Sequence, residues 1–511
     1  MRTQILIAFI LFIINLQLLN TNVNAQSYFN LDYRNDSSTY NSGHAVHQFA
    51  DSSGYLVISS FLGVDLKTRY PRIIKLNTLG DTLWTNSFGN FHYIQFPTNS
   101  NYVSIGDTNF LFTSALLLDS SSQTQDSVII SLFKIDDKGN ILWEKEFGDR
   151  NKFTLVADIK QTDEGGFIMT GSTTGWGSTN SGISSFLLKV DSLGNEEWHQ
   201  IYGGGSFRES YSVEVTADNG YIMAGRFYQS TATKEDINVV KTDSLGNLTW
   251  SKTYGTPEQD NTFAYITRYM NTGDYILVGG IDIVPGNILS DFQGYIARIS
   301  GLNGNVIWAD TMGIVQNGTQ DVFSSNVIIS PNGGIIGVGG THYASSTGAV
   351  DAWIVKYNSN GNLLWQRTFN KYGGNNWNYL VDIHQTYDNG FVLCGDLTNV
   401  AIPEQNLWVL KLDSMGCEIV NCSVGVEEPP SLLGRAGVGI YPNPNNGKFT
   451  ITLVENEQQV PIFIYNLSGQ VVQQLNINNN AIIDMSKQPN GIYFVKVVQH
   501  NKVSIMKIIK D

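Results

Sequence analysis

The sequence predicts an all-β protein: a seven-bladed β-propeller followed by a small C-terminal Ig-like β-sandwich. Three observations support this prediction. A short motif with one Trp recurs along most of the chain, and each copy follows one tight turn and contains another. The chain also contains 50 Gly, 12% aromatic and only 15% charged residues, a composition typical of strands rather than helices.

The repeated motif is clearest in Lys189–Tyr202 (KVDSLGNEEWHQIY) and Lys241–Tyr254 (KTDSLGNLTWSKTY). It consists of a basic residue, an Asp or Asn, a Gly, a Trp and, four positions later, an aromatic residue. A truncated copy begins at Lys411. The Trp residues of the six longer copies are 59, 55, 52, 58 and 57 residues apart. A period of this size indicates a radial or stacked repeat architecture.

Each repeat also has a Gly turn upstream of its Trp, as in TDEGGFIMTG at Thr162 and TADNGYIMAG at Thr216. Asp/Asn-Gly pairs between apolar runs form hairpin turns, because Gly and Asn tolerate positive φ. The DSLGN segment is a second such turn, so each repeat has four strands and seven repeats predict seven blades. We expect each Trp ring to lie between neighbouring blades. We expect the repeated Lys or Arg to lie at a blade edge with its charged head in solvent.

The last repeat has no strand with a Trp, and the start of the mature chain supplies a candidate. Phe29 and Tyr33 are four positions apart, like Trp198 and Tyr202. We therefore predict that Tyr28–Arg34 is the outer strand of the last blade. Closure of the ring by both chain ends would remove an open sheet edge.

The N-terminus predicts a secretory signal peptide over residues 1–25, with Arg2, an apolar run over 5–19 and Ala25 before the cleavage site. A membrane anchor is the less favoured alternative, because the apolar run is short and contains polar residues. The propeller is then expected over 26–422. No transmembrane segment is expected after cleavage.

Charge and cysteines restrict the partners and the compartment. The net charge of −14 and the pI near 4.9 argue against a nucleic-acid partner. Cys394 lies in an apolar run and is expected to be buried. In an exported protein, Cys417 and Cys422 are expected to form a local disulfide, with two free thiols as the alternative.

The pattern D-x-x-G-N-x-x-W, as in Asp191–Trp198, resembles the tryptophan-docking repeat of quinoprotein-type (PQQ-like) propellers over roughly residues 43–420. The resemblance implies the blade geometry only. Quinoprotein dehydrogenases hold their cofactor over a disulfide between adjacent cysteines, and no two cysteines are adjacent here. We therefore predict no cofactor.

The tail begins after a linker expected over residues 423–437. Region 438–511 has alternating apolar strands with Asn-Gly and Ser-Gly turns, which predict the small β-sandwich. It closely resembles the type A sorting domain of the type IX secretion system of certain Gram-negative bacteria, with an ordinary structural β-domain as the alternative. The matching residues are Tyr441, Pro442, Asn443, Pro444, Gly447, Gly469, Gly491, Tyr493 and Lys507. The resemblance implies handling by the type IX machinery and delivery through the periplasm to the cell surface or the medium.

The sequence contains no G-x-S-x-G, H-E-x-x-H, Walker or EF-hand motif. His44 and His47 are expected on opposite faces of a strand, so no metal site is predicted. Five polar residues of the innermost strands fall in one column, and we expect them to line a central channel that holds water, with a bound cation as the less favoured alternative. They are Asn101, Asp158, Ser212, Asn326 and Asp382.

The remaining connections are long and unlike one another, and they are expected on the face opposite the repeated turns. Binding residues concentrate in irregular loops on a rigid scaffold. The candidate binding residues are Trp176, Phe207, Arg208, Tyr228, His342, Tyr343 and Trp377. For each of them, packing within its own loop is the alternative.

We therefore expect an exported, cell-surface or released binding module for a glycan or a protein, rather than an enzyme. One alternative is a polysaccharide lyase or hydrolase with its site in the propeller mouth. Another is a structural adhesion or matrix component. The expected partners are the type IX secretion machinery and this glycan or protein ligand.

Overall fold

The structure is a computed structural model, and all of its described elements are strands. It describes residues 28–34, 40–63, 69–88, 102–106, 108–118, 127–177, 182–203, 208–228, 235–254, 261–282, 292–312, 322–341, 349–373, 376–399, 404–418, 438–441, 447–453, 459–466, 470–478, 480–499 and 502–510. The predicted signal peptide over 1–25 and the linker over 423–437 lie outside these residues.

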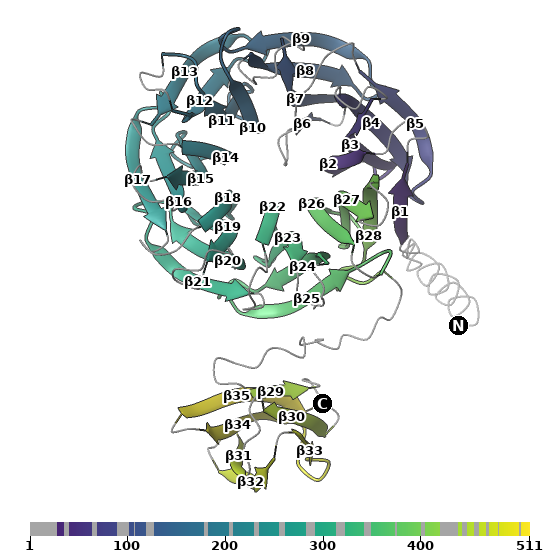
Figure 1. Cartoon of the computed structure of the whole chain (residues 1–511), viewed down its shortest axis with the longest axis vertical. Coiled ribbons are helices and arrows are strands. Elements are labelled where there is room, and N and C mark those ends of the chain that lie inside the picture. Colours follow the sequence, from purple (N-terminus) through teal and green to yellow (C-terminus); the bar gives the residue numbers. More distant parts are fainter. Residues whose placement is uncertain are drawn as a thin grey trace, which may run out of the picture.

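Within the described part of the chain, seven four-stranded antiparallel sheets form a ring of blades (Figure 1). Blade 1 consists of β2 (Asn41–Gln48), β3 (Gly54–Leu62), β4 (Arg69–Asn77) and β5 (Thr82–Ser87). Blade 2 consists of β6 (Tyr102–Ile105), β7 (Asn109–Leu117), β8 (Val128–Asp136) and β9 (Ile141–Phe147). Blade 3 consists of β10 (Thr154–Gln161), β11 (Phe167–Thr173), β12 (Ser184–Val190) and β13 (Glu196–Tyr202). Blade 4 consists of β14 (Arg208–Val215), β15 (Tyr221–Tyr228), β16 (Glu235–Thr242) and β17 (Leu248–Tyr254). Blade 5 consists of β18 (Asn261–Tyr269), β19 (Asp274–Asp282), β20 (Phe292–Ser300) and β21 (Val306–Met312). Blade 6 consists of β22 (Val322–Ile329), β23 (Ile335–Thr341), β24 (Asp351–Tyr357) and β25 (Leu363–Phe369). Blade 7 consists of β26 (Trp377–Gln385), β27 (Phe391–Asn399), β28 (Glu404–Leu412) and β1 (Phe29–Tyr33). This arrangement confirms the predicted all-β propeller.

The N-terminal strand closes the ring as predicted. β1 pairs antiparallel with β28, from Phe29 opposite Lys411 to Tyr33 opposite Leu407. The Tyr33 hydroxyl donates to the carbonyl oxygen of Gly80 in blade 1, at 3.1 Å. Blades 7 and 1 are therefore joined by the two ends of the propeller segment.

The repeated Trp residues pack between blades, which confirms their predicted role. A Cβ on Gly194 would stand 2.7 Å from Cη2 of Trp143, a distance that real Cβ contacts essentially never show. Gly194 also has a φ of 78°. The ring of one blade therefore lies against the turn glycine of the next. The same contact recurs in the pairs Trp84–Gly139, Trp198–Gly246, Trp250–Gly304, Trp308–Gly361 and Trp365–Gly416.

The DSLGN turns are held by one local hydrogen-bond pattern. In the turn of blade 3, Oδ1 of Asp191 accepts from the backbone N–H groups of Leu193 and Asn195, each at 2.8 Å. Oδ2 of Asp191 accepts from the Asn195 side-chain amide at 2.9 Å. These bonds lower the pKa of Asp191, the backbone bond from Asn195 most of all. Asp136 and Asp243 hold their turns in the same way.

The expectation for the repeated basic residue was wrong, because its charged head is paired inside the blade in several copies. Nζ of Lys411 lies 2.9 Å from Oδ2 of Asp388, and the Lys411 side chain is completely buried. Lys189 is buried between Glu164 and Glu197, at 2.9 and 2.8 Å. The acidic residue of the Gly turn and the basic residue of the third strand thus tie the two halves of a blade together. Lys241–Asp218 and Arg298–Asp274 are further examples.

The tail forms two facing sheets with a core of its own, in agreement with the predicted small β-domain. One sheet contains β29 (Val438–Tyr441), β30 (Lys448–Leu453) and β33 (Asn480–Asp484). The other has the order β32 (Val471–Ile477), β31 (Val460–Asn466), β34 (Gly491–Gln499) and β35 (Lys502–Lys510). Residues of both sheets meet in one apolar cluster that includes Phe449, Ile462, Ile483, Tyr493 and Val495.

Candidate functional site

The blade topology separates two faces of the ring. Consecutive strands pair in order from β10 to β13 and likewise in the other blades, so successive connections alternate between the two ends of each sheet. The Gly turns and the DSLGN turns therefore share one face, which we call the turn face. The second connection of each blade and the link to the next blade share the other, which we call the loop face.

Trp176 lies on the loop face of blade 3 and packs within its own blade. Its ring stacks on His199 with centroids 4.6 Å apart and contacts Phe186 edge-on at 5.0 Å. Its backbone N–H donates to Oδ2 of Asp149 at 2.7 Å. Trp176 thus fastens the second connection of blade 3 to the outer strand, which is the alternative role left open by the sequence.

Trp377 is the first residue of β26, at the loop-face end of the inner strand of blade 7. Its side chain is 47% exposed, which makes it the most exposed Trp of the described residues. Trp176 and Trp377 belong to blades 3 and 7, which are not neighbours in the ring (Figure 1). The two residues therefore do not form one contact site.

The other candidate binding residues are placed only in part. Arg208 begins β14 and Tyr228 ends β15, and the side chains of both lie outside the described part. Phe207, His342 and Tyr343 lie wholly outside the described residues.

One loop-face link has a role that the sequence did not reveal. Nζ of Lys371 donates to the carbonyl oxygen of Asn30 at 2.7 Å, and the Tyr372 hydroxyl donates to Oδ2 of Asp32. Both acceptors belong to β1. The link between blades 6 and 7 therefore clamps the closing strand, although more than 300 residues separate it from β1 in sequence.

The predicted channel column is corrected by the structure. Oδ2 of Asp158 accepts from the backbone N–H of Val213 in the next blade at 2.9 Å. Oδ2 of Asp382 does the same for Val46 at 2.8 Å. Oγ of Ser212 accepts from Ile266 at 2.7 Å. These side chains are buried and bridge neighbouring inner strands rather than lining a channel. A β-bulge precedes each of them in its strand and changes the direction of the side chain that follows. Asn101 and the side chain of Asn326 lie outside the described part.

Two positions further along these inner strands, blade 3 has Lys160 and blade 4 has Glu214, while blades 1 and 7 both have a His, His47 and His384. Nζ of Lys160 contacts both carboxylate oxygens of Asp158, at 2.8 and 3.0 Å. Burial lowers the pKa of Lys160, but the charges of Asp158 and Glu214 outweigh it and the net shift is upward. Burial raises the pKa of Glu214, which accepts from the Thr267 hydroxyl at 3.3 Å.

The two histidines singled out in the sequence belong to separate environments. His44 is buried, with Nε2 2.8 Å from Oγ of Ser60. The His47 ring lies edge-on to His384 of blade 7, with centroids 5.1 Å apart. Within the described residues, no three His, Cys, Asp or Glu side chains are grouped as metal ligands would be.

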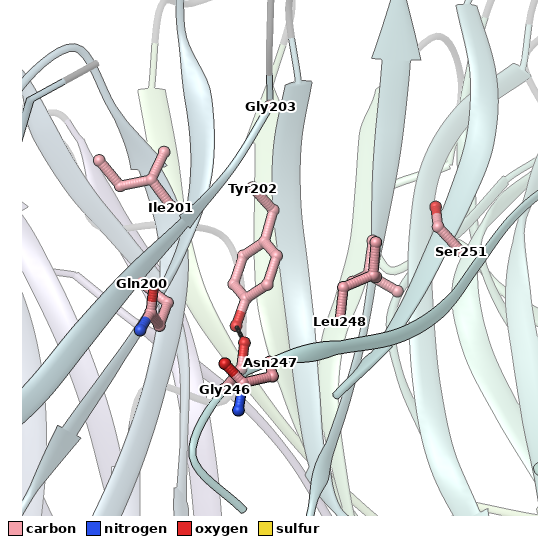
Figure 2. Close-up of a pocket in the computed structure, with 9 residues that line it drawn as sticks. Gln200, Ile201, Tyr202, Gly203, Gly246, Asn247, Leu248 and Ser251 are labelled. Carbon is pink, nitrogen blue, oxygen red and sulfur yellow. Dashed lines mark hydrogen bonds between the residues drawn. The ribbon is translucent and has the colours of Figure 1, made fainter. Parts of the chain in front are cut away.

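A groove of about 520 Å³ lies on the outer wall of the ring, between blades 3 and 4 (Figure 2). On the blade 3 side, β13 contributes Gln200 and Ile201, and Tyr202 lies beneath them. The Tyr202 hydroxyl donates to the carbonyl oxygen of Gly246 at 2.6 Å, which joins the two blades at the base. The blade 4 side is lined by Val240, Asn247, Leu248 and Ser251. This groove has no signal in the sequence, because its walls are repeated scaffold positions.

Cys417 takes part in a disulfide, Cys394 is a free buried thiol, and Cys422 lies outside the described residues. In the tail, Gly447 has a φ of 99°, and a Cβ there would lie 3.0 Å from the Ser486 backbone and from Lys510.

Tyr493 is buried and donates to the carbonyl oxygen of Pro489 at 2.7 Å. Gly491 pairs with Lys510, and Lys507 lies opposite Phe494 in β35. Tyr441 ends β29. Pro442, Asn443, Pro444 and Gly469 lie outside the described residues.

These features define a β-propeller protein with a separate C-terminal β-domain. Residues 439–511 match the family model of the secretion system C-terminal sorting domain. The chain is therefore an exported protein that carries a type IX sorting domain and is delivered to the cell surface or released. Among the described residues, no helix has the length and apolar character needed to cross a membrane.

Several solved structures are similar to the chain at low identity. The polysaccharide lyase Uly1 is 10% identical with a TM-score of 0.43, covering 76% of this chain and 92% of its own. The β-propeller domain of the Trilobed protease from Pyrococcus furiosus is 10% identical with a TM-score of 0.38, covering 77% and 99%. A protein of unknown function from Dyadobacter fermentans is 10% identical with a TM-score of 0.39, covering 60% and 92%. A comparison with curated protein sequences gave no match.

Proposed function

We propose that this protein is an exported binding module that presents its ligand site on the loop face of the propeller. The ligand class is a glycan or an extracellular protein. The proposal rests on a difference between the two faces of the ring. The repeated Trp, Gly, Asp and Lys positions serve the scaffold, whereas the loop-face connections differ in length and sequence from blade to blade.

Trp377 is the described residue best suited to contact a ligand on this face. Its ring is 47% exposed at the start of β26, and an exposed aromatic face can stack on a sugar or fill a pocket in a protein. Of the other predicted binding residues, His342 and Tyr343 follow β23 of blade 6, the neighbour of blade 7, and belong to the same proposed site. Arg208 and Tyr228 belong to blade 4 and would form a separate contact on this face.

The test compares two Trp substitutions in the mature protein. Trp377→Ala should weaken binding in a glycan-array or pull-down assay by about tenfold or more and leave the melting temperature unchanged. Trp176→Ala should lower the melting temperature, because its stacking on His199 is lost. Unchanged binding by Trp377→Ala would place the ligand elsewhere than on this part of the loop face.

An enzyme is the second candidate, and one observation favours it. Lys160, Glu214 and His384 come from inner strands of three blades. Lys160 and Glu214 are each absent from the equivalent position of the neighbouring blades, whereas His384 has His47 as its counterpart in blade 1. Charged side chains of this kind could serve as acid and base in a polysaccharide lyase or hydrolase. Release of shortened chains from a bound polysaccharide by the wild-type protein would favour this role over binding alone.

A further inference from the structure

We propose that the outer edge of β13 and the groove beside it form a docking site for an extended, basic polypeptide segment of a partner protein. This site lies on the outer wall between blades 3 and 4 and is separate from the loop face. It therefore extends beyond the proposed function and does not depend on it.

The first argument is the unpaired edge. β13 pairs with β12 on one side and has no partner on its other side among the described residues. An edge strand offers backbone N–H and C=O groups at the spacing of another strand. Only an extended polypeptide can satisfy such a row, and strand addition of this kind is a recurrent mode of peptide recognition.

The second argument is the groove, which would accept the side chains of the added strand. It is open beside β13 over about 520 Å³, and Figure 2 shows Leu248 and Ser251 on the strand that faces Gln200 and Ile201. Leu248 is 61% exposed and offers apolar area at the groove wall. The side chain of Gln200 is exposed and has no hydrogen-bond partner among the described residues. The base is held firmly, because Tyr202 bonds to Gly246 at 2.6 Å.

The third argument is charge, which selects the partner. Glu196 and Glu197 on β13 are 38% and 47% exposed, and Glu164 beside them is 61% exposed. Lys189 is buried and already shared by Glu164 and Glu197, and Glu196 contacts Nδ1 of His199 at 2.7 Å. A basic segment is therefore attracted to this edge. A second copy of the chain is disfavoured as the occupant because the net charge is −14.

The experiment uses the mature full-length protein and fluorescently labelled peptides of alternating Val and Lys. Binding measured by fluorescence anisotropy is expected for this peptide and not for the matched peptide of alternating Val and Glu. Two further peptides carry N-methyl groups on alternate residues, one in each register. Because only alternate N–H groups of a strand face its neighbour, one methylated peptide should lose binding and the other should keep it.

Substitutions in the protein locate the site. Leu248→Lys should weaken binding of the Val-Lys peptide by about tenfold, since it adds a like charge and removes apolar area from the groove. Leu245→Lys is the matched control, because Leu245 is 64% exposed on the adjacent turn and does not line the groove. It should bind like the wild type. The proposal is overturned if the Val-Lys peptide does not bind, if both methylated peptides behave alike, or if both Lys variants have the same affinity.

Discussion

The turn glycines of the propeller meet two constraints at once. Gly194 adopts a positive φ of 78°, and its missing Cβ leaves room for the Trp143 ring of the preceding blade. Gly165 also has a positive φ, of 87°, but no atom stands within 4 Å of the position of a Cβ. Substitutions at these two positions therefore distinguish the cost of backbone strain from the cost of a clash between blades.

Gly194→Ala should destabilise the protein more than Gly165→Ala does. Both variants carry the cost of positive φ, about 1–2 kcal/mol. Gly194→Ala adds the displacement of the Trp143 ring, a further cost of about 1–3 kcal/mol. Chemical denaturation measures both free energies of unfolding. Equal losses would show that the ring can move away without penalty.

The buried pair of Lys411 and Asp388 makes stability depend on pH. Burial alone would raise the pKa of Asp388, but hydrogen bonds from Thr386 and Lys411 outweigh it and the pKa lies below its ordinary value. The stabilisation from this carboxylate is thus present above the unfolded pKa of about 4, and it is lost as pH falls through the lower folded pKa. The melting temperature of the wild type should fall steeply below about pH 4.

Asp388→Asn should remove this component of the acid dependence and destabilise the protein at neutral pH by about 3–5 kcal/mol, because it leaves a buried ammonium unpaired. The double variant Asp388→Asn, Lys411→Met should recover part of that loss. An identical acid profile in wild type and Asp388→Asn would rule out this role of the pair.

At the scale of elements, the repeated features of the fold could be predicted from the sequence, whereas contacts between residues far apart in the sequence could not. The Trp residues, the two turns of each blade and the closing strand follow from periodicity and turn chemistry. The prediction that the Lys411 ammonium lies in solvent was wrong, because the general preference of Lys for the surface gives no information about Asp388. This partner lies 23 residues away in sequence, across the blade. Asp158 was expected in the channel because alternation alone ignores the bulge before it. The clamp of Tyr372 on Asp32 has no local signal at all.

Deletion of the closing strand, residues 28–34, should lower the melting temperature of the whole propeller. It removes the pairing with β28 and leaves the apolar seam of blades 7 and 1 open where Phe29 packs with Tyr55 and Val409. Phe29→Ala should have a smaller effect in the same direction, at about 3–5 kcal/mol. Calorimetry measures both. A deletion variant that melts like the wild type would contradict closure by β1.

At the scale of the molecule, the propeller and the tail have separate cores and separate tasks. The tail has its own apolar cluster around Ile462 and Val495, with no member from the propeller. Deletion of residues 438–511 should therefore leave a folded propeller that accumulates in the periplasm. Cell fractionation and the melting temperature of the retained protein check the two halves of this prediction. Surface display without the tail would refute the sorting role of this domain.

The pairing of β1 with β28 also determines when the ring can close during export. Phe29 and its partner Lys411 are 382 residues apart in the chain (411 − 29 = 382). During export the strand that leaves the inner membrane first must stay unpaired until the last blade has followed it. Contacts of such large sequence separation form late and slowly. We expect ring closure to be a late step in the folding of the propeller, and the interval before it is when the incomplete ring is most open to proteolysis or to capture by other chains.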